Sequence, residues 1–121
     1  MNQTSKARIN ITQRMLNKSI IDANKSVVAF FREHLPEQGY DFIVNGGKNV
    51  ILAHYDDGHE YTPTSIRLYR RPRGDKLMSV EGLTKRANAG NVMTFEHDKE
   101  SNRIIVRLEL GEPPKEINLI E

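Results

Sequence analysis

The stretch IRLYRRPRGDKLMSVEGLTKRANAGNVMTF, residues 66–95, decides the fold. It starts in a run rich in apolar and aromatic side chains, passes through an arginine-, glycine- and proline-rich loop, and returns to an apolar run at residues 77–80. A Gly-Leu pair at residues 82–83 then opens a short helix, and Ala-Gly-Asn at residues 89–91 turns the chain into another strand. The stretch predicts strand, loop, strand, short helix, turn and strand.

Outside this stretch the chain supplies more strands and one longer helix. Five apolar residues recur at helical spacing: Val27, Val28, Phe30, Phe31 and Leu35. They predict a helix over residues 22–35 that Asp22 caps and Pro36 ends. The predicted strands cover residues 8–12, 40–44, 49–55, 61–71, 77–80, 92–97 and 103–110. Turns are predicted at Asn45-Gly46-Gly47 and at Asp56-Asp57-Gly58. Seven short strands and two short helices indicate a mainly β, largely antiparallel barrel or sandwich.

The composition fits one folded domain. The chain has 121 residues, of which 37% are apolar and 28% charged, enough for a single hydrophobic core. It has no cysteine, which excludes disulfide scaffolds and thiolate sites and fits a reducing cytoplasm. No apolar run is long enough to span a membrane, and residues 1–6 lack a signal-peptide core. We therefore expect a cytoplasmic protein without membrane contact, with a disordered segment at 1–6, a domain over 7–112 and a tail or linker at 113–121.

The charges are separated along the chain although the net charge is only +2. Residues 1–32 have six basic side chains and one acidic one, and residues 61–95 have seven and two. The blocks 33–60 and 96–121 are acidic, with one basic side chain against six acids and four against seven. Two basic blocks that form one face would suit a polyanion. The alternative is a solvated surface on which like charges cluster by chance.

The end of the strand at residues 61–71, together with the loop that follows it, is the strongest candidate for nucleic-acid contact. Its candidate contact residues are Arg67, Tyr69, Arg70, Arg71, Arg73, Asp75 and Lys76. An arginine presents a fork of donors that pairs with guanine O6 and N7 or with phosphate. Pro72 and Gly74 shape the loop tip so that these forks project, and Asp75 either orients an arginine or accepts from a cytosine amine. The alternative is a strand edge protected by charges.

A second candidate segment follows the first predicted strand. Its candidate contact residues are Gln13, Arg14, Asn17 and Lys18. Amide side chains match adenine, arginine matches guanine, and lysine suits phosphate. The alternative is a polar connector that leads into the helix, and the two interpretations differ in whether this segment lies beside the arginine-rich loop.

Residues 54–60 raise the hypothesis of a metal site, because imidazoles and carboxylates lie close together in the sequence. The pair Asp57-Gly58 is explained equally by a tight turn. The chain has no Glu-x-Lys or Asp-x-Lys triplet, no phosphate-binding glycine loop and no Gly-x-Ser-x-Gly motif. We therefore expect no catalytic residue, no metal and no cofactor.

The order of the predicted elements resembles that of the B3-like DNA-binding pseudobarrel. This domain occurs in plant transcription factors and in the effector or target-recognition domains of some restriction endonucleases. The match is closest over residues 66–95 and looser over residues 7–110. The family usually has a Gly-Asp-x-x-x-Phe-like turn, whereas this chain has Asn91 between Gly90 and the run that ends in Phe95. That departure touches no candidate contact residue.

The resemblance implies an open seven-stranded pseudobarrel that grips duplex DNA in a concave surface with two arms. One arm corresponds to residues 13–19 and the other to residues 69–76. The resemblance further implies that the domain reads the major groove sequence-specifically and is not catalytic. Such a prokaryotic domain would be the recognition domain of a restriction-modification protein, whose catalytic domain would lie elsewhere in a longer chain. The alternatives are a basic-faced protein that binds RNA or an acidic protein, and a metal-dependent nuclease centred on residues 54–60.

Overall fold

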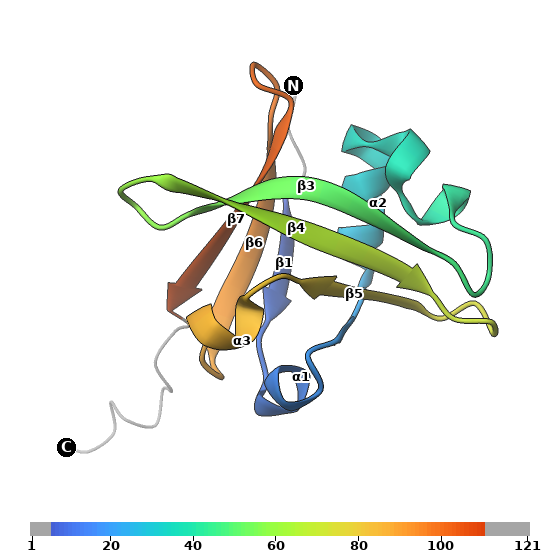
Figure 1. Cartoon of the computed structure of the whole chain (residues 1–121), viewed down its shortest axis with the longest axis horizontal. Coiled ribbons are helices and arrows are strands. Elements are labelled where there is room, and N and C mark those ends of the chain that lie inside the picture. The colour runs from blue at the N-terminus through green and yellow to red at the C-terminus, as the bar shows by residue number, and fades with distance from the viewer. Residues whose placement is uncertain (1–5, 111–121) are drawn as a thin grey trace.

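A computed structural model describes residues 6–110 (Figure 1). Within them the strands are β1 (Ala7–Asn10), β2 (Ile21–Asp22), β3 (Lys48–Asp56), β4 (Tyr61–Arg70), β5 (Lys76–Val80), β6 (Asn91–Asp98) and β7 (Arg103–Leu110). The helices are α1 (Gln13–Lys18), α2 (Lys25–His34) and α3 (Leu83–Arg86), with 3-10 turns η1 (Pro36–Gln38) and η2 (Tyr40–Phe42). None of these helices is long and apolar enough to cross a bilayer. The predicted N-terminal segment, except Lys6, and the predicted tail lie outside the described residues.

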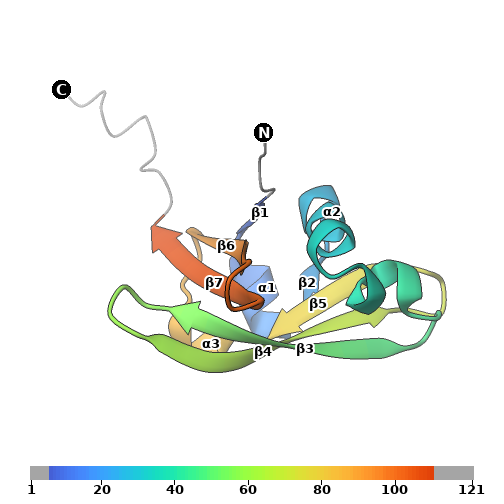
Figure 2. The same cartoon turned by 90° about the horizontal axis from the view of Figure 1, so that it is seen from above.

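The strands form one curved sheet in the order β1-β6-β7-β3-β4-β5-β2. Neighbouring strands are antiparallel except β3 and β7, which run parallel. The sheet curls into a half-barrel, and its edge strands β1 and β2 do not pair with each other (Figures 1 and 2). The prediction of a mainly β, largely antiparallel, seven-stranded open pseudobarrel is confirmed.

Helix α2 packs on the inner side of the half-barrel (Figure 2). Its buried residues are Val27, Phe30 and Phe31. The two phenyl ring centroids lie 6.3 and 6.2 Å from that of Phe95 on β6, and burial of each such side chain contributes roughly 1.5–3 kcal/mol. The helix begins later than predicted because Asn24 caps it, with Oδ1 accepting from the Val27 amide at 2.9 Å. The predicted cap, Asp22, belongs to β2 instead.

The strand predicted at residues 40–44 is absent, and the chain turns through η2 there. The Tyr40 hydroxyl donates to the Leu77 carbonyl at 2.6 Å inside the core. Arg70 Nη1 donates to the Tyr40 and Ile43 carbonyls, both at 3.1 Å. These tertiary bonds satisfy carbonyls that a strand would pair with a neighbour, so local β propensity does not decide the conformation. The turn at Asn45-Gly46-Gly47 consequently leads from η2 into β3 rather than joining two strands.

Two short elements take the place of the predicted connector. Helix α1 begins after Thr12, whose Oγ1 accepts from the Met15 amide at 3.2 Å, and ends at Ser19 with a φ of 55°. It is a third α-helix, beyond the two predicted. Strand β2 follows, and its Ile21 is fully buried opposite Met78 of β5. Two residues are too few to show strand alternation, so only tertiary pairing defines this strand.

The hairpin of β3 and β4 matches its prediction. The Asp57 Oδ1 accepts from the His59 and Glu60 amides at 2.8 and 2.9 Å, and Gly58 has a φ of 94°. Pro63 lies beyond the end of the pairing with β5, which starts at Ile66. That end of β4 is therefore an edge, where a proline is tolerated as predicted.

Candidate nucleic-acid interface

The candidate site lies on the outer face of the sheet near the β2 edge. The register places Tyr69 of β4, Leu77 of β5 and Asp22 of β2 side by side across three strands. Arg67 and Ser79 form the neighbouring pair on the same face, since residues two apart on a strand share a face. Helix α1 and the loop between β4 and β5 project beside this face (Figure 1).

The first arm, expected at residues 13–19, is built around α1 and includes its N-cap Thr12. Arg14 and Lys18 are four residues apart, so they share one side of the helix and both line the same cleft. Gln13 and Asn17 occupy the adjacent side, where Gln13 Nε2 donates to Asn17 Oδ1 at 3.0 Å. All four side chains are exposed. The helix therefore separates its cations from its amides.

The second arm, expected at residues 69–76, is in the structure the tight turn of residues 71–75, because the flanking residues belong to β4 and β5. The Arg71 amide donates to the Asp75 carbonyl at 2.9 Å, and the Gly74 amide donates to the Arg71 carbonyl at 2.7 Å. Gly74 has a φ of 98°, a conformation that favours glycine. Arg71 and Arg73 are both exposed on this closed turn, so their guanidinium groups project from a defined backbone.

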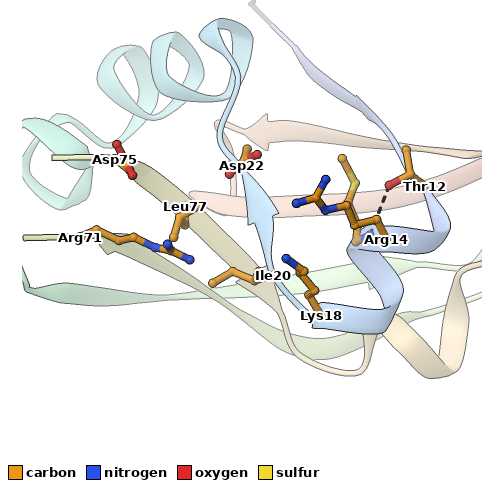
Figure 3. A pocket seen from close by; sticks show the side chains of 9 residues that line it. Thr12, Arg14, Lys18, Ile20, Asp22, Arg71, Asp75 and Leu77 are labelled. Carbon is orange, nitrogen blue, oxygen red and sulfur yellow. Dashed lines mark hydrogen bonds between the residues drawn. The ribbon is translucent and has the colours of Figure 1, made fainter. Parts of the chain in front are cut away.

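A cleft of about 350 Å³ lies between the two arms (Figure 3). It is lined by the cations Arg14, Lys18 and Arg71, the acids Asp22 and Asp75, and the apolar residues Ile20 and Leu77, together with Thr12 and Met15. Two segments that are far apart in the sequence thus border one cavity, which is what the two-arm hypothesis requires. The pairing of β2 with β5 brings them together.

The cations of the arms are not neutralised by strong ion pairs. The close ion pairs lie elsewhere, at 2.6–3.0 Å: Lys6–Glu96, Arg32–Asp41, Arg107–Asp56 and Arg107–Glu96. Within residues 6–110, no ion pair involves Arg14, Lys18 or Arg71, and Arg73 approaches the Asp75 carboxylate only to 3.9 Å. Such cations keep their attraction for an external anion.

Arg67 and Tyr69 extend this surface onto β4. Arg67 is exposed and Tyr69 is half-buried. A hydrogen bond with Ser79 lowers the pKa of the Tyr69 hydroxyl, and the nearby Arg67 and Lys48 lower it further. Both predicted residues therefore lie on the same face as the cleft.

Arg70 and Lys76 lie on the other face, away from the cleft. Arg70 of β4 pairs with Lys76 of β5, one residue along each strand from the Tyr69–Leu77 pair. Because successive residues of a strand point to opposite faces, this pair lies on the opposite face of the sheet. The Arg70 guanidinium is bound to the carbonyls around η2. Lys76 lines a second cavity together with residues of α2. These two predicted contact residues are therefore separated from the others, which lie on the arms or on the outer face of β4.

Two of the three acids in residues 54–60, Asp56 and Asp57, accept bonds from their own turn, and Asp56 also accepts from Arg107. Asp56 accepts from the Gly58 amide at 2.9 Å and from Arg107 Nε at 2.8 Å, and these bonds lower the pKa of its carboxyl. Bonds from the Glu60 and His59 amides likewise lower the pKa of Asp57. Within residues 6–110, no group of three or more His, Cys, Asp or Glu side chains is arranged to hold a metal ion.

Within the first arm, Thr12 and Met15 line the cleft in addition to the predicted contact residues. Outside the predicted segments, sequence reasoning missed three further lining residues: Ile20, Asp22 and Leu77. The sequence places Leu77 only in a strand and Asp22 only at a helix cap. No local pattern identifies them, because their position depends on the pairing of β2 with β5.

Comparison of the chain with models of known families, with curated proteins and with solved structures gave no match. Its function is therefore inferred from the geometry and charge of the cleft and from the resemblance of residues 66–95.

Proposed function

We propose that this chain is a B3-like, sequence-specific double-stranded DNA-binding domain that reads the major groove with its two arms. The observation that carries the proposal is the cleft itself, which has cations without close ion-pair partners on both sides. A duplex is a polyanion whose groove admits a helix about 10–12 Å wide and offers acceptors that arginine matches.

Some side chains of the arms contact phosphates and others contact base edges. Lys18 and Arg73 contact phosphates and set the register of the domain on the duplex. Arg14 and Arg71 donate to guanine, and the amide pair Gln13 and Asn17 contacts base edges beside them. Arg67 and Tyr69 support the duplex from the outer face of β4. Because both arms are anchored on one sheet, little conformational entropy is lost on binding.

The wider role is that of a non-catalytic recognition domain of a cytoplasmic prokaryotic restriction-modification protein, with catalysis elsewhere in a longer chain. The resemblance of residues 66–95 to the B3-like domain supports this part of the proposal. The engagement of Asp56 and Asp57 in turn and ion-pair bonds also favours a structural role for the β3–β4 hairpin.

The test is a comparison of two double variants that remove equal charge. Arg71→Ala/Arg73→Ala removes the cations of the second arm, and Lys99→Ala/Arg103→Ala removes two exposed cations at the β6–β7 hairpin. A lost bidentate base contact costs about 1–3 kcal/mol, and a lost phosphate contact weakens binding further. We expect the arm variant to bind a selected duplex at least about 30-fold more weakly, and the control variant to bind within about threefold of the parent.

The same titrations decide between the alternatives. Equal loss in both variants would mean that net charge, not the arms, drives binding, and the proposal would fail. Preference for RNA or for an acidic protein as competitor would favour the first alternative. Cleavage of the duplex in Mg²⁺ that His54→Ala or Asp57→Ala abolishes would favour the nuclease.

A further inference from the structure

The cleft holds a carboxylate between its cations. Asp22 lies beside Leu77 in the sheet register, and its side chain is exposed. Figure 3 shows the Arg14 guanidinium turned toward Asp22 from α1, while Arg71 enters the cleft from the second arm. Within residues 6–110, no ion pair or side-chain hydrogen bond engages the Asp22 carboxylate.

A carboxylate in this place has specific consequences for a DNA ligand. It only accepts hydrogen bonds, and it repels phosphate, which offers no donor. The donors of the major groove are the cytosine N4 amine and the adenine N6 amine. Adenine also presents its N7 acceptor on the same edge, which would face the carboxylate, whereas cytosine presents no acceptor there. Cytosine therefore fits Asp22 better than adenine does.

The cations beside Asp22 fit the partner of that cytosine. In a C·G pair, the guanine O6 and N7 acceptors lie next to the cytosine amine in the major groove. Arg14 and Arg71 border the cleft on its two sides and carry the donors that these acceptors require. Building on the proposed function, we infer that the cleft reads a C·G base pair, with Asp22 accepting from cytosine N4 and Arg14 or Arg71 donating to guanine.

Asp75 provides a matched control within the same cleft. It has the same charge, but Arg73 Nη2 lies 3.9 Å from its carboxylate, and it also borders the cavity on the α2 side. We assign it to orienting Arg73 rather than to reading a base. Replacing either acid by asparagine removes one negative charge from the cleft, so a general electrostatic effect appears in both variants.

The test is a binding-site selection on randomised duplexes with the parent chain, Asp22→Asn and Asp75→Asn. We expect the parent to require a C·G pair at one position, with at least about tenfold discrimination against the other three pairs. In Asp22→Asn this discrimination falls by about threefold or more, to the level that the arginine–guanine contact alone provides, whereas Asp75→Asn retains it. Replacing that cytosine by N4-methylcytosine, whose methyl group displaces the groove donor, weakens binding by the parent about tenfold and by Asp22→Asn little.

Each outcome is decisive. Retention of the full C·G preference by Asp22→Asn overturns this inference and leaves the two-arm function standing. Loss of the preference in both variants shows a general charge effect and also overturns it. A parent chain that binds no duplex overturns the proposed function and this inference together. Circular dichroism and melting curves establish that the isosteric variants are folded.

Discussion

At the scale of single residues, adjacent arginines have opposite roles. Arg70 turns inward from β4, and its guanidinium binds the carbonyls of Tyr40 and Ile43. Arg71 begins the second arm and faces the cleft. The sequence cannot distinguish the two, because a strand places successive side chains on opposite faces and the register decides which face is inside.

This difference predicts opposite effects on stability. Arg70→Ala leaves two carbonyls without their charged donor, so we expect the free energy of unfolding to fall by about 1.5–3 kcal/mol. Arg71→Ala removes an exposed side chain and should change it by less than about 0.5 kcal/mol. Urea titrations of both variants measure the two values. Equal, small losses would show that the Arg70 bonds do not stabilise the fold.

At the scale of elements, the sequence predicts those parts that local patterns determine. The apolar spacing of α2, the turn at Asp57-Gly58 and the position of the strand at residues 103–110 match the structure. Burial along β7 does not alternate, because the consecutive residues Ile104, Ile105 and Val106 are all buried. The failures are η2, β2 and α1. Residues 40–44 are β-prone but are bent by Arg70 and by the buried Tyr40 hydroxyl. The other two elements are short, and tertiary packing defines them, so the sequence could name the arms' residues but not their shape.

Ion pairs support the short parallel pairing of β3 with β7. Arg107 of β7 binds Asp56 of β3 at 2.8 Å and Glu96 of β6 at 2.6 Å. The bond from the Gly58 amide, and then that from Arg107, lower the pKa of Asp56 below its ordinary 3.8. Burial raises the pKa of Glu96, but bonds from Arg107 and Lys6 outweigh it and lower the pKa below 4.5.

The direction of these shifts predicts the pH dependence of stability. Both carboxyls have a lower pKa in the folded chain, so their contribution is present above about pH 4.5 and is lost as the pH falls through the folded-state values. Arg107→Gln should therefore lower the melting temperature most near neutral pH, and its difference from the parent should shrink toward pH 3. Melting curves between pH 3 and 7 measure this. A constant difference would assign the effect of Arg107 to packing.

At the scale of the whole molecule, the half-barrel brings basic segments that are separated in the sequence to one surface, the cleft between the arms. The two basic blocks of the sequence, residues 1–32 and 61–95, contribute one arm each. The acidic blocks 33–60 and 96–121 contribute Asp56 and Glu96 to the network around Arg107. Only the sheet order, in which β2 lies beside β5, brings both basic blocks to one cleft.

If both arms contact the same duplex, their phosphate contacts add. Each phosphate contact contributes about one unit to the slope of log K against log salt concentration. We expect Lys18→Ala and Arg73→Ala each to reduce that slope by about one, and the double variant by about two, with similar losses on every DNA sequence. Lys76→Ala is the matched control, because Lys76 directly follows the second arm but faces the cavity beside α2, so its slope should equal that of the parent. Binding measured at several salt concentrations tests this. If only one of the two arm variants changes the slope, a single arm holds the duplex and the two-arm model is wrong.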